Sequence, residues 1–175
     1  PGNALIDDLM FYFFKRNFDK NGKCASRGQI NKNLIDKFQN DSYFNLKYPK
    51  SLDREHFKEF YQKLKKLNKL NSISTASIMT VVSIYNAVKL SNTKFDKLIL
   101  TGGGRKNTFI VNELKKLLEK QKIKIQLIDK YNFDGDMLES QAFAYIAIRS
   151  FLKLPLSTPT TTGVKKPISG GQIFI

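Results

Sequence analysis

Three consecutive glycines, Gly102, Gly103 and Gly104, are the residues best suited to hold a ligand through the backbone. They follow a short apolar run that ends at Thr101 and precede a segment with the periodicity of a helix. Residues without a Cβ let the backbone approach a ligand closely, and the amides that begin a helix attract anions. The pattern fits a nucleotide-binding turn or a flexible strand-to-helix turn, and it matches neither a Walker loop nor a dinucleotide fingerprint.

A second glycine-containing turn begins the sequence, where Gly2 and Asn3 precede an apolar stripe of helical period. Asn3 is suited to be an N-cap, and Asp7 would lie near the positive end of the helix. This turn is interpreted either as a phosphate-binding turn or as an ordinary capped helix start. Asn107, which follows the triple glycine, is by itself interpreted as the cap of the next helix.

The stretch from Gly135 to Glu139 also has two interpretations. In the first it is a capping box, with Asp136 at the N-cap and Glu139 at the third helical position. In the second, Glu139 points from the first helical turn into a cleft and accepts a hydrogen bond from a sugar hydroxyl. Taken alone, the stretch favours the capping box.

The net charge of +15 would normally suggest a nucleic-acid partner, but its distribution argues against one. The basic residues are mostly Lys and are scattered along the chain, whereas base recognition favours Arg side chains grouped on one element. Cys24 is the only cysteine, so an internal disulfide is excluded. No signal peptide is evident and no apolar run reaches the length of a membrane span, so we expect a cytoplasmic protein without a membrane partner.

Helical and alternating apolar patterns define the elements that must position these residues. We expect helices from Asn3, over 30–38, from 51 or 53 to 67, over 73–90, after Asn107 and over 137–152, and strands over 95–101 and 123–127. The strand–helix–strand unit has the length of a right-handed crossover between parallel strands. Ligands of such sheets bind beyond the carboxyl ends of the strands, which is where the triple glycine falls. The proline-containing segment after residue 152 is expected to be extended.

Six groups of residues, in order along the chain, resemble motifs of the anhydro-N-acetylmuramic acid kinases. They are Pro1-Gly2-Asn3 with Asp7; Asp19-Lys20-Asn21-Gly22 with Ala25-Ser26-Arg27-Gly28; Pro49-Lys50-Ser51 with Arg54-Glu55; Gly102-Gly103-Gly104 with Asn107; Gly135-Asp136 with Glu139 and Ala142-Phe143-Ala144; and Leu154-Pro155 with Pro159 and Thr162-Gly163. Leu9, Met137 and Ser157 depart from residues common in the family. Jointly the six groups cover the whole chain and are specific.

The resemblance implies an α/β fold that is one half of the sugar kinase/actin-like (ribonuclease H-like) two-domain fold, with a mixed sheet flanked by helices. Residues 1–175 would be the C-terminal, nucleotide- and sugar-binding domain, and the N-terminal domain would be absent. It implies that ATP and anhydro-N-acetylmuramic acid bind between the domains with Mg²⁺. Water would open the 1,6-anhydro ring while O6 takes the γ-phosphate, giving N-acetylmuramic acid 6-phosphate in peptidoglycan recycling.

The resemblance assigns phosphate and nucleotide binding to Gly2, Asn3, Gly102, Gly103, Gly104 and Asn107, and sugar binding to Glu139. It assigns no metal ligand. The family's catalytic base would precede Pro1, so residues 1–175 alone are expected to be inactive. Homodimer formation is left open. The alternative function is a non-catalytic nucleotide-binding or basic scaffold protein built on the same half-fold, with an anionic partner for its positive charge.

Overall fold

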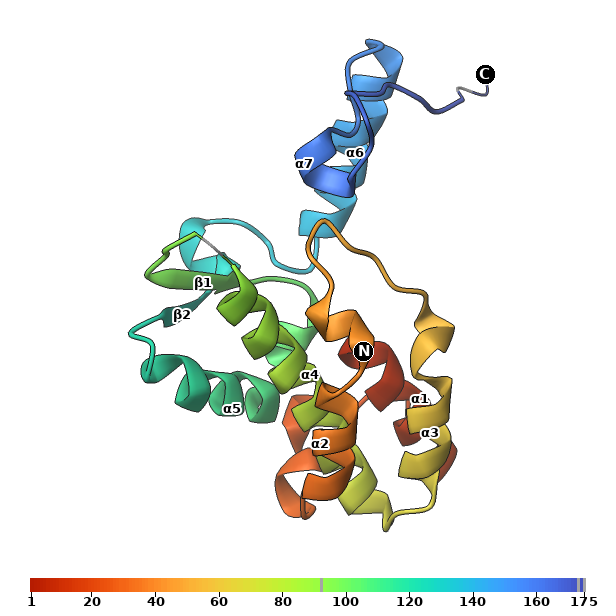
Figure 1. The fold of residues 1–175 in the computed structure, drawn as a ribbon, viewed down its shortest axis with the longest axis vertical. Helices are drawn as coiled ribbons and strands as arrows, with labels where there is room; N and C mark the ends of the chain where they lie inside the picture. The colour runs from red at the N-terminus through yellow and green to blue at the C-terminus, as the bar shows by residue number, and fades with distance from the viewer. Residues whose placement is uncertain (92, 173, 175) are drawn as a thin grey trace.

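A computed structural model of the protein describes residues 1–91, 93–172 and 174, with the backbone alone at Arg54. Most helices pack into one body around the long helix α4, and a small sheet lies at one edge of this body. A second long helix, α6, extends away from the body together with the C-terminal segment (Figure 1).

The structure contains seven α-helices and two β-strands among the described residues. These are α1 Gly2–Phe14, α2 Lys32–Gln39, α3 Lys58–Lys65, α4 Lys69–Leu90, β1 Lys97–Leu100, α5 Thr108–Glu119, β2 Lys124–Leu127, α6 Leu138–Phe151 and α7 Pro159–Thr162. Short 3₁₀ helices connect them: η1 Lys20–Gly22, η2 Ala25–Arg27, η3 Ser42–Asn45, η4 Arg54–Phe57, η5 Gly103–Lys106 and η6 Ile128–Tyr131. The expected elements are therefore present, with boundaries shifted by a few residues.

Helix α4 forms the centre of the hydrophobic core. Ile73, Ala76 and Met79 are fully buried in it, and α1, α2, α3 and α5 all pack against the helix. Because neighbours surround α4, apolar residues on more than one of its faces can leave water, which is the main favourable term in folding. The prediction of a deeply buried helix is confirmed for residues 72–82, which are almost all buried, whereas residues 83–90 are half-buried or exposed.

The expectation that no segment reaches the length of a membrane span was wrong for α4. By length and composition alone this helix could cross a membrane, although half of its most apolar window is buried inside the protein. Its small polar side chains bond to neighbouring backbone: Ser74 donates to the carbonyl of Gly28 at 3.2 Å, and Thr75 accepts from the amide of Asn31 at 3.0 Å. These contacts are those of a core helix packed by other helices.

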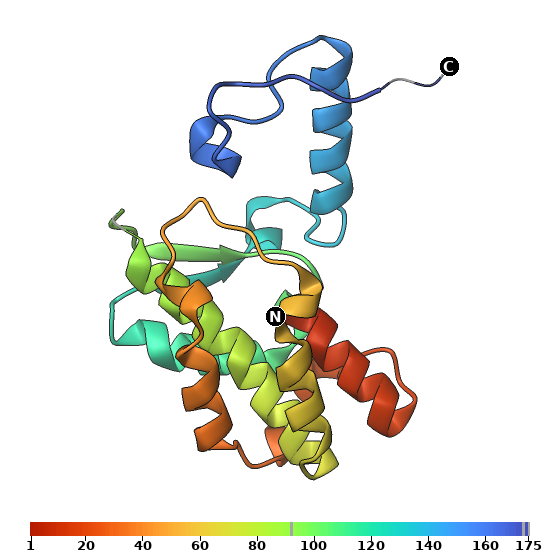
Figure 2. The ribbon, with the colours of Figure 1, turned by 45° about the vertical axis from the view of Figure 1, so that its right-hand side comes forward.

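Strands β1 and β2 form a parallel pair, with Leu98 opposite Ile125 and Leu100 opposite Leu127. Helix α5 is the crossover between them, so the predicted strand–helix–strand unit is confirmed. The predicted mixed sheet is not what the described residues form, because the only antiparallel pairing among them is the isolated bridge between Ser157 and Ile168. The residues after 152, expected to be extended, include the short helix α7 and fold back beside α6 (Figure 2).

Two predicted helix caps have different outcomes. The Asn107 side chain accepts a hydrogen bond from the amide of Ile110 at 3.2 Å and caps α5, as predicted. Asn3 is not the cap of α1, because the helix already begins at Gly2 and Asn3 lies inside its first turn. Its side-chain amide is consequently not engaged in capping.

A substitution at Gly28 tests how closely α4 packs against the preceding loop. A Cβ at this position would lie 2.1 Å from the carbonyl oxygen of Leu70, an atom of the α4 backbone that cannot easily move. Gly28→Ala is expected to lower the free energy of unfolding by about 1–3 kcal/mol, as overpacking does. Urea unfolding measures this, with Gly170→Ala as the control because its Cβ would meet nothing within 4 Å. Equal midpoints for the two variants would contradict the packing described.

Candidate functional site

The first turn of α1 and the glycine loop meet in space, although they are far apart in the sequence. A Cβ at Gly103 would lie 3.7 Å from Nδ2 of Asn3, and one at Gly104 would lie 3.6 Å from both Nδ2 and Oδ1 of Asn3. Helix α4 holds the start of α1 in place, since the Thr80 hydroxyl donates to the carbonyl of Gly2 at 3.2 Å. The two turns to which the family resemblance assigns phosphate binding therefore border the same place.

Only some glycines of this site need the conformational freedom of the residue type. Gly2 and Gly102 have φ of 67° and 73°, in the left-handed region that side chains disfavour. Gly103 and Gly104 do not have positive φ, so within this loop the left-handed conformation occurs at Gly102 alone. A Cβ at Gly102 would meet nothing within 4 Å, which shows that its surface faces open space.

Backbone amides at the start of α1 are available to an anion. The first amides of any helix have no carbonyl partner within the helix, and Pro1 at the N-cap makes no side-chain capping bond. With 13 residues, α1 has a dipole whose positive end lies at Gly2 and Asn3. The site thus combines a helix terminus, a glycine loop and the Asn3 side chain, which makes no hydrogen bond with the other described residues.

A buried arginine that the sequence analysis did not single out anchors the glycine loop. Only 6% of the Arg105 side chain is exposed. Its Nε and Nη2 donate to the two carboxylate oxygens of Asp129 at 2.8 and 2.9 Å, and its Nη1 donates to Asp136 at 2.6 Å. Nη1 also donates to the carbonyl of Gly102 at 3.1 Å. The two-pronged pairing with Asp129 is the strongest form of such contacts.

Gly135 lets the two loops approach closely. Its carbonyl accepts from the amide of Gly102 at 3.1 Å, and a Cβ on it would lie 2.4 Å from Nε of Arg105. Arg105, Asp129, Asp136 and Gly135, with the Gly102 backbone, are called the arginine latch below. The latch joins the glycine loop to the turn that leads into α6.

The predicted capping box at the start of α6 was wrong. The carboxylate of Asp136 is engaged by Arg105 and by Nζ of Lys106 at 2.5 Å, and α6 starts at Leu138 without a side-chain capping bond. Glu139 lies in the first turn of α6, is exposed, and makes no hydrogen bond or ion pair with the described residues. Its acceptor oxygens are therefore not used by the helix itself, and its assignment to the sugar stays a prediction.

Asn107 is placed beneath the glycine loop rather than at its open surface. The residue is buried, its side chain caps α5, and its amide donates to the carbonyl of Gly104 at 3.0 Å. This geometry makes Asn107 a support for the loop. A direct contact between Asn107 and a nucleotide stays a prediction.

A groove of about 1080 Å³ opens beside the start of α1. Gly2 and Leu5 of α1, Thr80 of α4, and Tyr43 and Lys50 of the segment between α2 and α3 are among its lining residues. The sequence analysis missed this groove because its walls come from segments that only the tertiary fold brings together. Its position next to Gly2 places an open volume beside the predicted phosphate turn.

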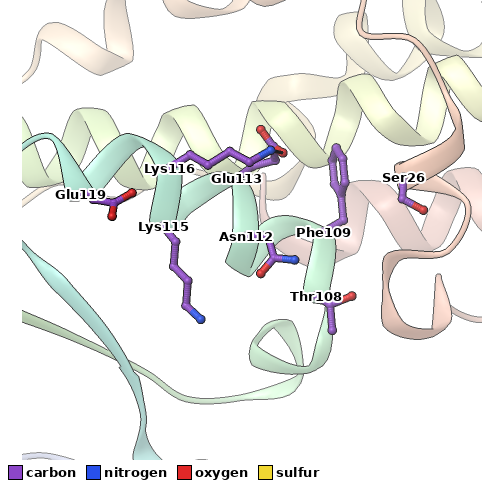
Figure 3. Close-up of a pocket in the computed structure, with 8 residues that line it drawn as sticks. All are labelled: Ser26, Thr108, Phe109, Asn112, Glu113, Lys115, Lys116 and Glu119. Atoms are coloured by element: carbon purple, nitrogen blue, oxygen red, sulfur yellow. Dashed lines mark hydrogen bonds and ion pairs between the residues drawn. The ribbon is translucent and has the colours of Figure 1, made fainter.

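A smaller hollow of about 390 Å³ lies over the outer face of α5 (Figure 3). Thr108 and Phe109 begin it, and Lys115, Lys116 and Glu119 continue it along the helix. Lys116 is paired with Glu113 at 2.6 Å, so part of its charge is already neutralised. No residue predicted to bind nucleotide or sugar lines this hollow.

The carboxylates of the arginine latch make its stability depend on pH. Hydrogen bonds from Arg105 lower the pKa of Asp129 to about 2, and hydrogen bonds from Arg105 and Lys106 lower the pKa of Asp136. A carboxyl whose pKa is depressed by folding stabilises the folded state above its unfolded pKa, near 4, and loses this contribution as the pH falls toward 2.

We expect Asp129→Asn to lower the thermal midpoint at pH 5 and to lose most of this effect as the pH falls from about 4 to about 2, because wild-type Asp129 itself takes up a proton over this range. Melting curves across this range measure the difference between the two proteins. Asp36→Asn, an exposed change on α2, is the control and should change the thermal midpoint little. If the difference in thermal midpoint between Asp129→Asn and the wild type is unchanged at pH 2, the assigned pairing is contradicted.

Comparison with known proteins assigns the family. The family model described as anhydro-N-acetylmuramic acid kinase matches residues 1–175. Proteins named anhydro-N-acetylmuramic acid kinase from Pelagibacter ubique, Cereibacter sphaeroides and Zymomonas mobilis are 38%, 35% and 32% identical, each over 99% of this chain and over 47%, 46% and 46% of their own lengths. The chain thus spans about half the length of the curated relatives it matches. With its whole length matched by the family model, the chain belongs to the anhydro-N-acetylmuramic acid kinase family.

Proposed function

We propose that the protein is an ATP-dependent sugar kinase that hydrolyses the 1,6-anhydro ring of anhydro-N-acetylmuramic acid and phosphorylates O6, giving N-acetylmuramic acid 6-phosphate. The observation that carries the proposal is the meeting of Asn3 with Gly103 and Gly104, which brings two predicted phosphate-binding turns of one family together. We further propose a cytoplasmic location, the place where ATP is supplied.

The residues around Asn3 fit a nucleotide. The start of α1 offers amides and a positive dipole end, and the glycine loop offers a backbone surface without side chains. ATP would supply the transferable γ-phosphate, and Gly2, Asn3 and the glycine loop would bind and orient its phosphates. Positioning of this kind is most of what a protein contributes to phosphoryl transfer.

Arg105 contributes by holding the loop, since its charge is already matched by two carboxylates. A phosphate would have to displace one of them to pair with this guanidinium. We therefore assign Arg105 a positioning role. The latch fixes where the Gly102 backbone lies relative to the turn that precedes α6.

We propose Glu139 as the sugar contact. It follows the latch residue Asp136 by three positions, so a ligand beside the glycine loop has a carboxylate within the same structural unit. A carboxylate without a partner can accept hydrogen bonds from hydroxyl groups, which is how sugars are commonly held.

We propose that residues 1–175 form the C-terminal domain of a two-domain, ribonuclease H-like kinase, with the catalytic base on polypeptide outside these residues. Residues 1–175 alone are then inactive. Mg²⁺ is expected from the resemblance, but in the part of the chain that the structure describes no group of three or more His, Cys, Asp or Glu side chains could hold a metal ion. No step is therefore assigned to the metal. ATP binding without sugar phosphorylation by the full-length protein would favour the scaffold alternative.

Gly103→Val in the full-length protein tests nucleotide binding. The new side chain would cover backbone that a phosphate must approach, so we expect ATP to bind about tenfold more weakly or worse, a change of about 1.4 kcal/mol. The fold should persist, because the nearest atom to a Cβ at Gly103 is Asn3 Nδ2 at 3.7 Å and its φ is not positive. Calorimetric titration measures the affinity, with Gly170→Val as the control. An unchanged affinity for ATP would show that the loop is an ordinary turn and not part of the nucleotide site.

Glu139→Gln in the full-length protein tests the sugar contact. The substitution replaces an acceptor oxygen with a donor, which costs on the order of 1–3 kcal/mol when a buried hydroxyl loses its partner. We expect a tenfold to hundredfold loss in kcat/KM for the anhydro sugar in an ADP-release assay. The melting temperature should not change, because Glu139 caps no helix. A kcat/KM equal to that of the wild type would show that Glu139 does not contact the sugar.

A further inference from the structure

Helix α6 has no buried residue, although it is 14 residues long and mainly apolar. Phe143, Tyr145 and Phe151 are 65%, 60% and 70% exposed. Both views show the helix standing away from the body formed by α1 to α5 (Figures 1 and 2). Such a large apolar area exposed to water marks an interaction site.

The exposed apolar side chains surround α6 rather than forming one stripe. Phe143 and Tyr145 are two positions apart, which at 3.6 residues per turn places them on nearly opposite sides of the helix. The same holds for Ile146 and Ile148, which are 41% and 59% exposed. A helix that is apolar all round is typically buried inside a protein.

The contacts that α6 makes with the C-terminal segment involve polar positions near its end. Ser150 donates to the carbonyl of Gly170 at 2.5 Å, and Arg149 donates to the carbonyl of Pro155 at 2.8 Å. The C-terminal segment thus lies against Arg149 and Ser150 and leaves the aromatic side chains uncovered.

The charge pattern identifies the chemistry of the missing partner. The chain has 30 basic residues, of which five are Arg, yet no Lys occurs between Lys130 and Lys153. Aromatic enrichment with Lys depletion is typical of the centre of a protein interface. Helices that lie on membranes usually carry Lys or Arg along a polar face, which α6 lacks. The partner is therefore an apolar polypeptide surface.

We propose that α6 is a docking helix and that further polypeptide of the same protein packs around it. This polypeptide corresponds to the half of the relatives that residues 1–175 do not match. The relatives match 99% of this chain, α6 included, and are about twice its length. A second copy related by a two-fold axis contacts α6 through one patch and covers one side of the helix. Covering opposite sides requires polypeptide that surrounds it. The proposal does not use ATP binding or catalysis, so it stands or falls independently of the proposed function.

The test compares hydrogen–deuterium exchange of α6 in three proteins: residues 1–175, the same residues joined to the unmatched half of the Pelagibacter ubique relative, and that relative itself. An isolated helix of this length is marginal in water, so its amides should exchange quickly in residues 1–175. We expect exchange about a hundredfold slower in the joined protein and at the matching segment of the relative, both as monomers.

Three outcomes of this comparison overturn the proposal. The first is rapid exchange at the matching segment of the folded relative, which decides the matter even if the joined protein fails to fold. The second is slow exchange that appears in residues 1–175 only as their concentration and dimer fraction rise, which makes a second copy the occupant. Protection that requires added lipid vesicles would instead indicate a membrane surface and also overturns it.

Variants on opposite sides of α6 test the surrounding partner directly. Phe143→Ser and Tyr145→Ser in the joined protein, or at the matching positions of the relative, should each speed α6 exchange about tenfold or more. Phe18→Ser is the matched control, because Phe18 is 60% exposed and lies between α1 and η1. An effect of only one α6 variant indicates a flat partner on one side and rejects the surrounding arrangement.

Discussion

The pairing of Arg105 with Asp129 and Asp136 is the interaction on which the candidate site depends. A guanidinium that is almost fully removed from water must have its donors satisfied, and here two carboxylates and the carbonyl of Gly102 do so. These bonds fix the glycine loop against the turn before α6. The pair of loops therefore behaves as one unit, and the proposed phosphate and sugar contacts lie on its two ends.

The second constraint is the packing of α4, which places that unit against α1. Helix α5 packs along α4 on one side and α1 packs on it on another, so the glycine loop after β1 arrives beside Asn3. The Thr80 hydroxyl bonds to the backbone of Gly2, and the Ser74 hydroxyl bonds to the backbone of Gly28. A single central helix thereby sets the geometry of a site whose residues lie far apart in the sequence.

Much of this architecture could be predicted from local patterns. Helical periodicity located α4 and α5, a short apolar run located β1 and alternation located β2. The type of Asn107 correctly predicted a cap. These features depend on neighbours in the sequence. The prediction of a capping box at Asp136 failed because a buried arginine 31 positions away competes for the same carboxylate. Hydrophobic periodicity carries no information about a contact between residues so far apart in the sequence. The groove beside Gly2 escaped prediction for the same reason, since tertiary packing alone creates it.

The distance along the chain between Asn3 and the glycine loop has a consequence for the order of folding. Contacts within the unit from β1 to the start of α6 join residues 24 to 31 positions apart, such as Arg105 with Asp129 and with Asp136. The contact with α1 closes a much longer stretch of chain, so its entropic cost is larger and its formation is expected later. The binding site is thus completed by one of the last steps of folding. A ligand bound between the two turns would oppose their separation and so stabilise the folded protein against unfolding.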